Sequence, residues 1–442
     1  MTAYDFRLAL LSLRRSPGLS ALMVLAIASG IAVCTISFAV YHAVSTNPIP
    51  WKNDQLYAVT LDTWDPQQAN DRDRPELPPP QLTHRDAVTL EQSDIPLRTV
   101  IMFKTERVLD SGVAGHKAFR GLLRATTGRF FPMFDVPFQY GAGWDAAADT
   151  NADPVVVLSK ETNDKTFGGE NSVGRMLSVG GHEMRVIGVL EEWVPSPKFY
   201  DLNNGPFDEP EDAYVPFRYA VDREFGQVGN TNCWKNERIE SRQDFLNSEC
   251  VWLQMWAELP TRADRDRFQA YLDNYARQQK ALGRMERPLN NQLYNVDQWL
   301  DFNQVVQKDN RVLIGIAMLF LAACLVNVVG LLLSKFLNGA AMTGLRRALG
   351  ASRRDIVRQH LAEVLLLSAA GGMLGLVLAA IGMAGIRVLY GPDTESIERL
   401  TQIDLVVVAA ALGLSLLAGV LAGLYPAWRI GRTSPAVYLK TQ

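Results

Sequence analysis

Four long apolar blocks constrain the fold of this chain more than any other feature of its sequence. The blocks cover residues 19–44, 312–333, 361–389 and 403–425. Each is long enough to cross a bilayer, which takes about 20 apolar residues. None carries an ionised residue in its middle; Glu363 and Arg387 lie near block ends, where a long side chain can reach the interface. The pattern therefore predicts a membrane protein with four transmembrane α-helices.

The composition of the whole chain hides this segregation. With 48% hydrophobic residues and a net charge of −3, the average resembles that of a soluble protein, because the charges concentrate between the blocks. Lysine and arginine dominate before the first block, between the second and third, and after the fourth, whereas acids dominate the link between the third and fourth. Because basic loops stay in the cytoplasm, we expect both termini there and residues 45–311 outside.

The first block follows a basic start, as the core of a secretory signal peptide does. Its apolar run is longer than such a core and no small-x-small cleavage site follows it, so we expect an uncleaved membrane helix. Ahead of it, the leucines between residues 8 and 13 predict an amphipathic helix on the inner membrane surface, which ends before Pro17.

The segment 45–311 is long enough for one or two globular subdomains. Strand patterns occur at residues 56–61, 154–159 and 184–190, and helical spacing occurs at 262–277. We therefore predict a large α+β domain between the first and second transmembrane helices. Because residues 296–313 contain no Pro or Gly, we also predict a helical stalk from about residue 296 into the second block; the alternative is an ordinary helix followed by an unmarked kink.

Cysteine usage fits an oxidising environment for the outer segment. Cys34 and Cys324 lie inside apolar blocks, where cysteine behaves as a small apolar residue. Cys233 and Cys250 are the only cysteines of the outer segment. We predict a disulfide between them, which could contribute up to about 3 kcal/mol; the alternative is two free buried thiols.

The sequence contains no recognisable catalytic constellation. Its five histidines lack metal-ligand spacing. Residues 169–176 carry the two glycines of a phosphate loop but lack its lysine and its magnesium-binding hydroxyl. We expect no catalytic residue, no metal site and no ATP hydrolysis by this chain.

Small and polar residues inside the blocks indicate how the helices pack. Gly371 and Gly375 in the third block, and Gly419 and Gly423 in the fourth, have the small-xxx-small spacing that lets helices approach closely. Asn327, midway through the second block, should face another helix. The alternative for the glycines is that Gly is simply common in membrane helices.

A short basic segment separates the second and third blocks. Its residues are Gly344, Leu345, Arg346, Arg347, Ala348, Leu349, Gly350, Ala351, Ser352, Arg353, Arg354, Asp355 and Ile356. A loop this short and this rich in arginine should stay in the cytoplasm. We interpret it as a compact, helical, cationic element that docks a partner.

A series of motifs, in order, resembles the MacB/FtsX-like permeases of ABC systems over nearly the whole chain. The motifs are Leu13-Arg14-Arg15, Pro17-Gly18, Gly128-Arg129-Phe130-Phe131, residues 154–159, Phe167-Gly168, residues 186–190, Gly371-Gly372 and Tyr425-Pro426-Ala427-Trp428-Arg429. The most specific match is residues 344–356, with Glu363 following. Each motif is weak alone, and their order carries the resemblance.

The resemblance implies a mechanism and a set of partners. In this family, the loop between the second and third spans carries a coupling helix that seats in a groove of an ABC ATPase subunit. ATP-driven closure of that subunit moves the membrane helices, the stalk and the periplasmic domain. The chain would then be a permease in the bacterial inner membrane that is no enzyme and binds no cofactor itself, while ATP and magnesium bind a separate ATPase subunit.

Other partners follow from the same resemblance. A second permease copy or a paralogous permease should complete a dimer in membrane lipid, and a periplasmic adaptor (membrane-fusion) protein and an outer-membrane channel could join it; nucleic acid is not expected. Two functions stay open: export or extraction of a substrate, or FtsX-like activation of a periplasmic enzyme such as a cell-wall hydrolase. The large outer segment favours the first, because such regulators usually have much smaller periplasmic domains.

The sequence predicts nine parts along the chain. They are a cytoplasmic amphipathic helix (1–18), transmembrane helix 1 (19–44), a periplasmic domain of two subdomains with its stalk (45–311), transmembrane helix 2 (312–334), a cytoplasmic loop with the coupling helix (335–360), transmembrane helix 3 (361–389), a short periplasmic loop (390–402), transmembrane helix 4 (403–425) and a cytoplasmic tail (426–442).

Two features depart from the family pattern. Met342 stands where the family often has an acid, which puts individual ATPase contacts in doubt. Residues 195–250, rich in Asn, Asp, Glu and aromatics, match nothing in the family, and we interpret them as the second periplasmic subdomain or as a solvated insertion.

Overall fold

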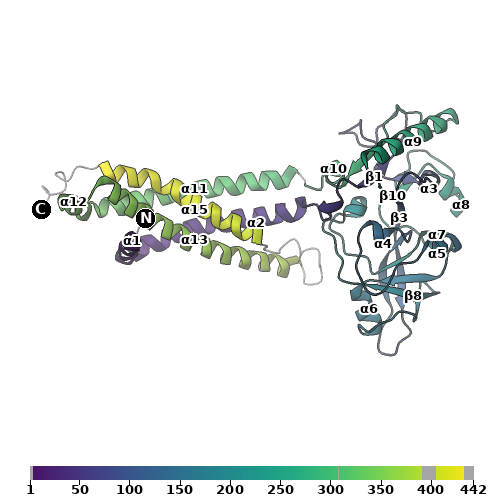
Figure 1. Ribbon diagram of the computed structural model, residues 1–442, viewed down its shortest axis with the longest axis horizontal. Helices are drawn as coiled ribbons and strands as arrows, with labels where there is room; N and C mark the ends of the chain where they lie inside the picture. Colours follow the sequence, from purple (N-terminus) through teal and green to yellow (C-terminus); the bar gives the residue numbers. More distant parts are fainter. Residues whose placement is uncertain (1–2, 307, 391–404, 433–442) are drawn as a thin grey trace. The chain divides into compact units, whose positions relative to one another are not determined.

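The computed structural model describes residues 3–306, 308–390 and 405–432. Contacts divide the chain into two compact units, a helical unit of Met1–Ser45 with Val306–Gln442 and a mixed α/β unit of Thr46–Val305 (Figure 1). The short loop predicted at 390–402 lies, apart from its first residue, outside the described residues, as does the last part of the predicted tail.

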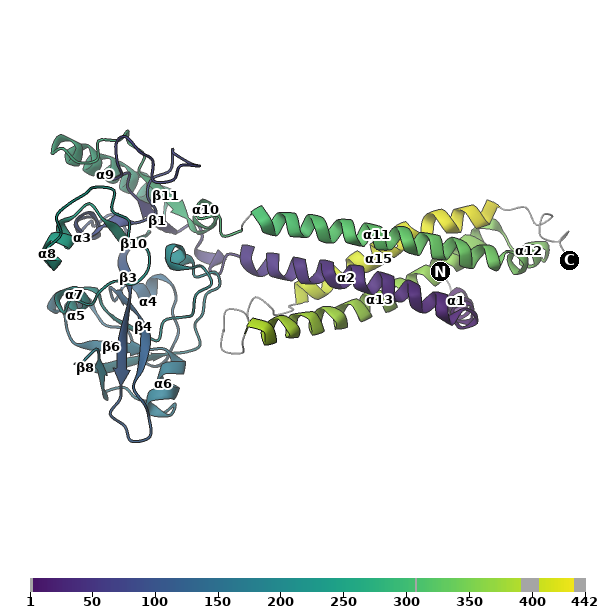
Figure 2. The ribbon, with the colours of Figure 1, turned by 180° about the vertical axis from the view of Figure 1, so that it is seen from behind.

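The helical unit contains four helices that are long and apolar enough to cross a membrane, counted over the described residues. They are α2 (Pro17–Ser45), α11 (Lys308–Asn338), α13 (Arg353–Tyr390) and α15 (Leu405–Arg432). α13 packs against α2 and α15, and α2 also packs against α11 (Figures 1 and 2). The four predicted spans are confirmed.

The ends of these helices differ from the predicted boundaries. α13 begins at Arg353, well before the apolar block, and its first turn carries the exposed Arg353 and Arg354. α15 continues through Pro426 to Arg432, where a tail was predicted from residue 426. Proline removes one backbone hydrogen bond, but a membrane helix tolerates this loss when its neighbours support it.

Two shorter helices complete this unit. The predicted N-terminal helix is present as α1 (Ala3–Arg15); Ser16 separates it from α2, which starts on Pro17, a favourable first residue for a helix. The second short helix is α12 (Ala340–Ala348), between α11 and α13. Both views place α1 at the same end of the bundle as α12 (Figures 1 and 2).

The predicted glycine contacts are confirmed. Gly371 and Gly375 of α13 face α2, where a Cβ added at Gly371 would lie 2.6 Å from Ile27. Gly419 and Gly423 of α15 face α13 in the same way. Any larger side chain at these four positions would push the helices apart, so their spacing sets how closely α13 approaches its neighbours.

Asn327 was predicted to face another helix, and within the described part of this chain it does not. Asn327 lies on an exposed face of α11, together with Ala323 and Gly330. A Cβ added at Gly330 would have no neighbour within 4 Å. α11 therefore presents a stripe of small and polar residues that the described part of this single chain leaves uncovered.

The α/β unit is built on one sheet of eleven strands with the order β11-β1-β10-β3-β4-β9-β6-β8-β5, with β2 beside β10 and β7 beside β3 and β8. The strands are β1 (Leu56–Thr60), β2 (Leu82–Thr83), β3 (Arg98–Asp110), β4 (Phe119–Thr126), β5 (Phe138–Gly141), β6 (Val155–Leu158), β7 (Met176–Val179), β8 (His182–Leu190), β9 (Ala213–Pro216), β10 (Val251–Glu258) and β11 (Gln292–Asn295). The predicted strands at 56–61, 154–159 and 184–190 correspond to β1, β6 and β8.

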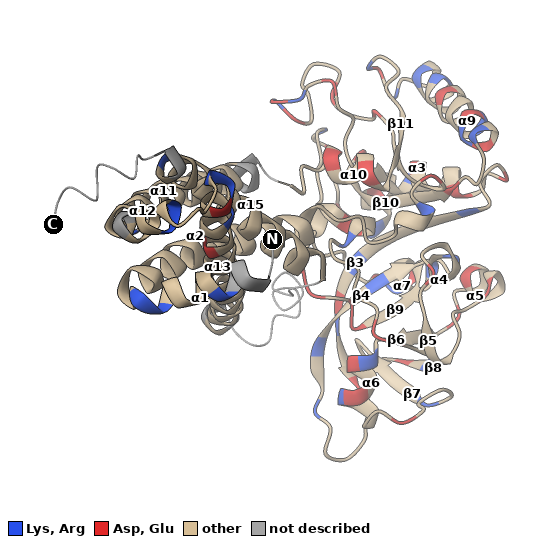
Figure 3. Ribbon diagram, turned by 60° about the vertical axis from the view of Figure 1, so that its left-hand side comes forward, with Lys and Arg blue, Asp and Glu red and all other residues tan. Residues whose placement is uncertain are grey.

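Helices cover this sheet. They are α3 (His84–Glu91), α4 (Phe130–Met133), α5 (Ala146–Asn151), α6 (Lys160–Phe167), α7 (Phe217–Asp222), α8 (Arg242–Asn247), α9 (Arg262–Ala281) and α10 (Val296–Phe302), with 3-10 turns at Pro50–Lys52 and Phe199–Asn204. α9, predicted at 262–277, buries Phe268 and Leu272 in the core. Positive and negative side chains alternate along α9 (Figure 3), which is typical of a helix with one solvated face.

The region 195–250 is neither a separate subdomain nor a solvated insertion. It supplies β9, which lies inside the sheet between parallel β4 and antiparallel β6. It also supplies Tyr200, Asp201 and Glu211, all fully buried. Because Thr46–Val305 forms one compact unit on one sheet, the prediction of two subdomains is wrong.

The predicted continuous stalk is also wrong, and the alternative of an interrupted helix is correct. α10 ends at Phe302 and α11 begins at Lys308. Gln304 adopts a left-handed conformation with φ +51°, and the Val305 N–H donates back to the Leu300 carbonyl at 3.1 Å. This is a helix-terminating motif that usually carries Gly or Asn at the left-handed position.

The predicted disulfide is present in the α/β unit. Cys233 and Cys250 are bonded, with their Cα atoms 4.2 Å apart, and Cys250 begins the turn into β10. Cys34 and Cys324 are free and buried between α2 and α11, as expected for cysteines inside apolar blocks.

Candidate functional site

The predicted docking segment 344–356 is a helix–turn–helix and not one helix. α12 ends at Ala348, and Gly350 adopts a left-handed conformation with φ +100° that glycine tolerates without strain. α13 then begins at Arg353. Ser352 and Asp355 cap this start reciprocally, since the Ser352 N–H donates to Asp355 at 3.1 Å and the Asp355 N–H donates to Ser352 Oγ at 3.2 Å.

The outer side of this helix–turn–helix combines apolar and cationic side chains. Leu345 is 47% exposed and Leu349 is 80% exposed, one turn further on. Arg353 and Arg354 follow at the start of α13 and are exposed. We call these four residues the docking face. Exposed leucines beside arginines form a surface suited to a protein partner.

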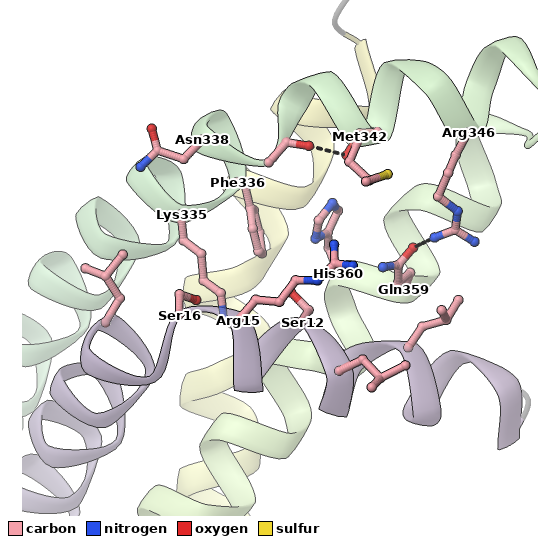
Figure 4. A pocket seen from close by; sticks show the side chains of 15 residues that line it. Ser12, Arg15, Ser16, Lys335, Phe336, Asn338, Met342, Arg346, Gln359 and His360 are labelled. Atoms are coloured by element: carbon pink, nitrogen blue, oxygen red, sulfur yellow. Dashed lines mark hydrogen bonds between the residues drawn. The ribbon is translucent and has the colours of Figure 1, made fainter.

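Arg346 does not belong to the docking face. Its guanidinium donates a hydrogen bond to the side chain of Gln359 on α13 and lies toward the interior of the bundle (Figure 4). The sequence pattern grouped Arg346 with the other arginines of the segment. The structure gives it a different environment, because α12 turns one of its sides toward α1 and α13.

A buried ion pair lies behind α12. Lys335 Nζ of α11 lies 2.5 Å from Glu363 Oε1 of α13. Lys335 also donates to Ser20 of α2 at 3.1 Å, and Ser12 of α1 donates to Glu363 at 3.1 Å. Glu363 is 0% exposed and Lys335 is 8% exposed. Four helices therefore meet at one pair of opposite charges.

This ion pair is the part of the site that sequence reasoning missed. Glu363 was expected to reach the membrane interface from a block end, and instead it is buried. A buried carboxylate is costly unless a cation and hydrogen bonds compensate it, and Lys335 and Ser12 do so here. The available signal was a lysine at the end of the second block and a glutamate at the start of the third.

A cavity of about 620 Å³ opens beside the ion pair, between α1, α11, α12 and α13 (Figure 4). His360 stands at its wall, with its ring centroid 4.0 Å from that of Phe336 and its Nδ1 3.8 Å from Glu363. No group of three or more His, Cys, Asp or Glu side chains within the described ranges could hold a metal ion.

The connectivity shows what this arrangement can do. Four residues separate Lys335 from the start of α12, and the turn at Gly350 leads directly into the helix that carries Glu363. A force applied to the docking face therefore reaches α11 and α13 through short, structured links. The buried ion pair joins the same two helices, so they respond together.

Comparison with known proteins decides the family. The MacB-like periplasmic core domain matches residues 20–275, and the FtsX-like permease C-terminal domain matches residues 313–435. The chain belongs to the MacB/FtsX-like permease family. Its mixed α/β core domain lies between the first and second of four membrane helices, which is the predicted fold class.

The individual relatives are distant. The macrolide export ATP-binding/permease protein MacB of Bdellovibrio bacteriovorus is 25% identical over 293 residues, covering 65% of this chain and 38% of that protein. The pyoverdine export ATP-binding/permease protein PvdT of Pseudomonas syringae is 25% identical over 320 residues, covering 71% of this chain and 42% of that protein. This chain thus spans less than half the length of these two relatives.

A solved structure gives a further comparison. The periplasmic region of MacB from Actinobacillus actinomycetemcomitans aligns with 59% of this chain and 96% of its own length, at 14% identity and a TM-score of 0.38. The two family matches and the two relatives, and not this structure, relate the chain to transporter permeases in general.

Proposed function

We propose that this chain is the permease subunit of a MacB-type ABC transporter that drives export or extraction of a substrate. An ABC ATPase binds ATP and magnesium and seats against the docking face. The observation that carries the proposal is the docking face itself, joined by short links to an ion pair that couples α1, α2, α11 and α13.

The proposal includes an orientation. The end of the bundle that carries α1 and α12 lies on the cytoplasmic side of a bacterial inner membrane, as the distribution of lysine and arginine indicates. The α/β unit then lies in the periplasm, where its disulfide is stable. α2 and α11 lead into and out of this domain in the sequence, so movement of either helix acts on it.

A second function is kept because the FtsX-like domain covers the membrane helices from residue 313 onward. In that case the same motion would activate a periplasmic enzyme, such as a cell-wall hydrolase, without moving cargo. Isolation of the tagged full chain with its partners separates the two. An ATPase with a periplasmic adaptor supports export, whereas an ATPase with a hydrolase and no adaptor would overturn it.

A second copy of this chain, or a paralogue, completes the transporter in this proposal. The uncovered stripe of Ala323, Asn327 and Gly330 on α11 supports close approach of another helix, because a polar side chain inside a membrane needs a partner. We expect Gly330→Leu to weaken the dimer at least tenfold, since Gly330 has open space in the single chain and leucine would fill it.

The matched control is Gly413→Leu. Gly413 is an exposed glycine of α15 that also has open space around it. The Gly413→Leu variant should leave the dimer intact if α11 forms the contact between the two copies. Dimer dissociation is measured by crosslinking of the full chain in membranes. Equal crosslinking of wild type and Gly330→Leu would remove α11 from the interface.

A further inference from the structure

The cavity beside the ion pair has two kinds of wall. Its apolar wall is formed by Leu8, Leu11, Leu19, Phe336 and Met342. Its polar wall carries three cations, Arg15, Lys335 and Arg346, and none of the described residues that line it is an aspartate or glutamate. A volume of about 620 Å³ falls in the ordinary range of ligand-binding cavities. The chemistry of the walls therefore favours an anionic group attached to an apolar body.

The positive charge of the cavity is not cancelled from within. The charge of Lys335 is compensated by that of Glu363, which lies behind the cavity wall. The hydrogen-bond partner of Arg346 is the neutral Gln359. Among the described residues, no carboxylate pairs with the exposed Arg15. Two guanidinium groups without a carboxylate partner among the described residues, one from α1 and one from α12, thus line the same cavity.

Buried polar atoms at the cavity point to the same conclusion. The hydroxyl of Ser16, which lines the cavity, is buried and makes no hydrogen bond within the described part of the chain. The Nδ1 of His360 makes none either, although it lies 3.8 Å from Glu363 behind the cavity wall. Buried polar groups are normally satisfied, so a ligand with acceptor and donor atoms would complete this wall.

We propose that the cavity binds an anionic phospholipid of the cytoplasmic leaflet, with its phosphate between Arg15 and Arg346 and its glycerol and acyl chains against the leucines. Basic cavities between membrane helices on the cytoplasmic side are suited to such headgroups, and an amphipathic helix such as α1 lies at the same depth. The proposal goes beyond the transport function but rests on the orientation proposed above. The lipid would join α1 to α12, and so regulate the element that meets the ATPase.

Lipid binding to the full chain in neutral detergent tests this proposal. Native mass spectrometry gives the affinities for phosphatidylglycerol and phosphatidylcholine. We expect the wild type to bind phosphatidylglycerol at least tenfold more tightly. The variant Arg15→Gln/Arg346→Gln should lose this preference, and Thr343→Phe, which fills the cavity without changing charge, should lose binding.

The matched control is Arg7→Gln/Arg14→Gln, which removes two exposed arginines of α1 that do not line the cavity. It should keep the preference of the wild type. An equal loss in this control, or an unchanged preference in Arg15→Gln/Arg346→Gln, would overturn the proposal. Competition by glycerol phosphate at the concentration of the lipid would also overturn it, in favour of a soluble anion. The ATPase is absent from this assay, so its result is independent of whether the docking proposal holds.

Discussion

Replacing Arg124 with methionine should lower the melting temperature of the α/β unit by about 10 °C, which corresponds to a loss of about 3–5 kcal/mol. Arg124 of β4 is fully buried, and its guanidinium lies 2.6 Å from Asp201 and donates from Nε to Glu211 at 3.1 Å. Lys198 and Tyr200 also contact Glu211. Without Arg124, two buried carboxylates would share one remaining lysine.

The pKa of Glu211 shows how strongly the cluster holds its charges. Burial alone would raise this pKa, but the charges of Arg124 and Lys198 override burial and lower it to about 2. A lowered carboxyl pKa contributes stability above the pKa of the unfolded chain, near 4.5, and this contribution is lost as the pH falls toward 2. The wild type should show this acid-dependent loss, and Arg124→Met should not.

The matched control for Arg124→Met is Arg120→Met on the same strand. Arg120 pairs with Glu106 at 3.5 Å, and its side chain is largely exposed, so the change should cost less than about 1 kcal/mol. Tryptophan fluorescence follows the melting of this unit in the full chain, because eight of the nine tryptophans lie between residues 46 and 305. Equal melting temperatures for the two variants would contradict the importance of the buried cluster.

The second large effect is expected at the ion pair of the membrane unit. Lys335→Met should destabilise the helical bundle by about 3 kcal/mol, because Glu363 would stay buried without its cation. The double variant Lys335→Met/Glu363→Gln should recover much of this loss, since no uncompensated charge remains. The measurement is the temperature at which the purified full chain loses its monodisperse peak in size-exclusion chromatography.

A surface ion pair on α13 provides the comparison for this experiment. Arg358 and Asp355 lie 3.5 Å apart and both side chains are nearly half exposed. Arg358→Met should therefore change the same temperature only slightly. If Lys335→Met behaved like Arg358→Met, or if the double variant were less stable than the single one, the buried pair would not be what joins the four helices.

Much of the fold could be predicted because the signals were local. Long apolar blocks identify membrane helices through length and hydropathy alone, and small-xxx-small spacing identified Gly371 and Gly419 as contact points. The disulfide followed from there being only two cysteines in the outer segment. These features depend on residue type and spacing, which one sequence contains.

The features that were missed depend on residues far apart in the sequence. In the sequence, Glu211 is one acid among many in the polar region 195–250. Only its pairing with Arg124 shows that this region enters the core. The pairing of Lys335 with Glu363 is of the same kind. The end of α10 was not predicted for a different reason. Gln304 occupies a left-handed position at which a glycine would have indicated the end of a helix.

The shape of the predicted docking segment differs from the expected one, while its docking role stays a prediction. Its composition predicted one cationic helix, whereas Gly350 divides it into two helices and separates Arg346 from Arg353 and Arg354. The proposed docking face therefore combines the exposed leucines of α12 with the first turn of α13, and not a single helical face. Met342, which departs from the family pattern, is half exposed and lines the cavity beside α12.

The most direct measurement of the central claim is co-purification of the ATPase with a charge-reversed permease. Arg353 and Arg354 of the docking face are changed to glutamate together, while Arg346 is kept because it lines the cavity. The control reverses Arg7 and Arg14, two exposed arginines on α1. We predict that the first variant stays in the membrane but retains less than about a tenth of the ATPase, because two attractive contacts become repulsive, whereas the control retains it fully. Full retention of the ATPase by the first variant would contradict the docking assignment.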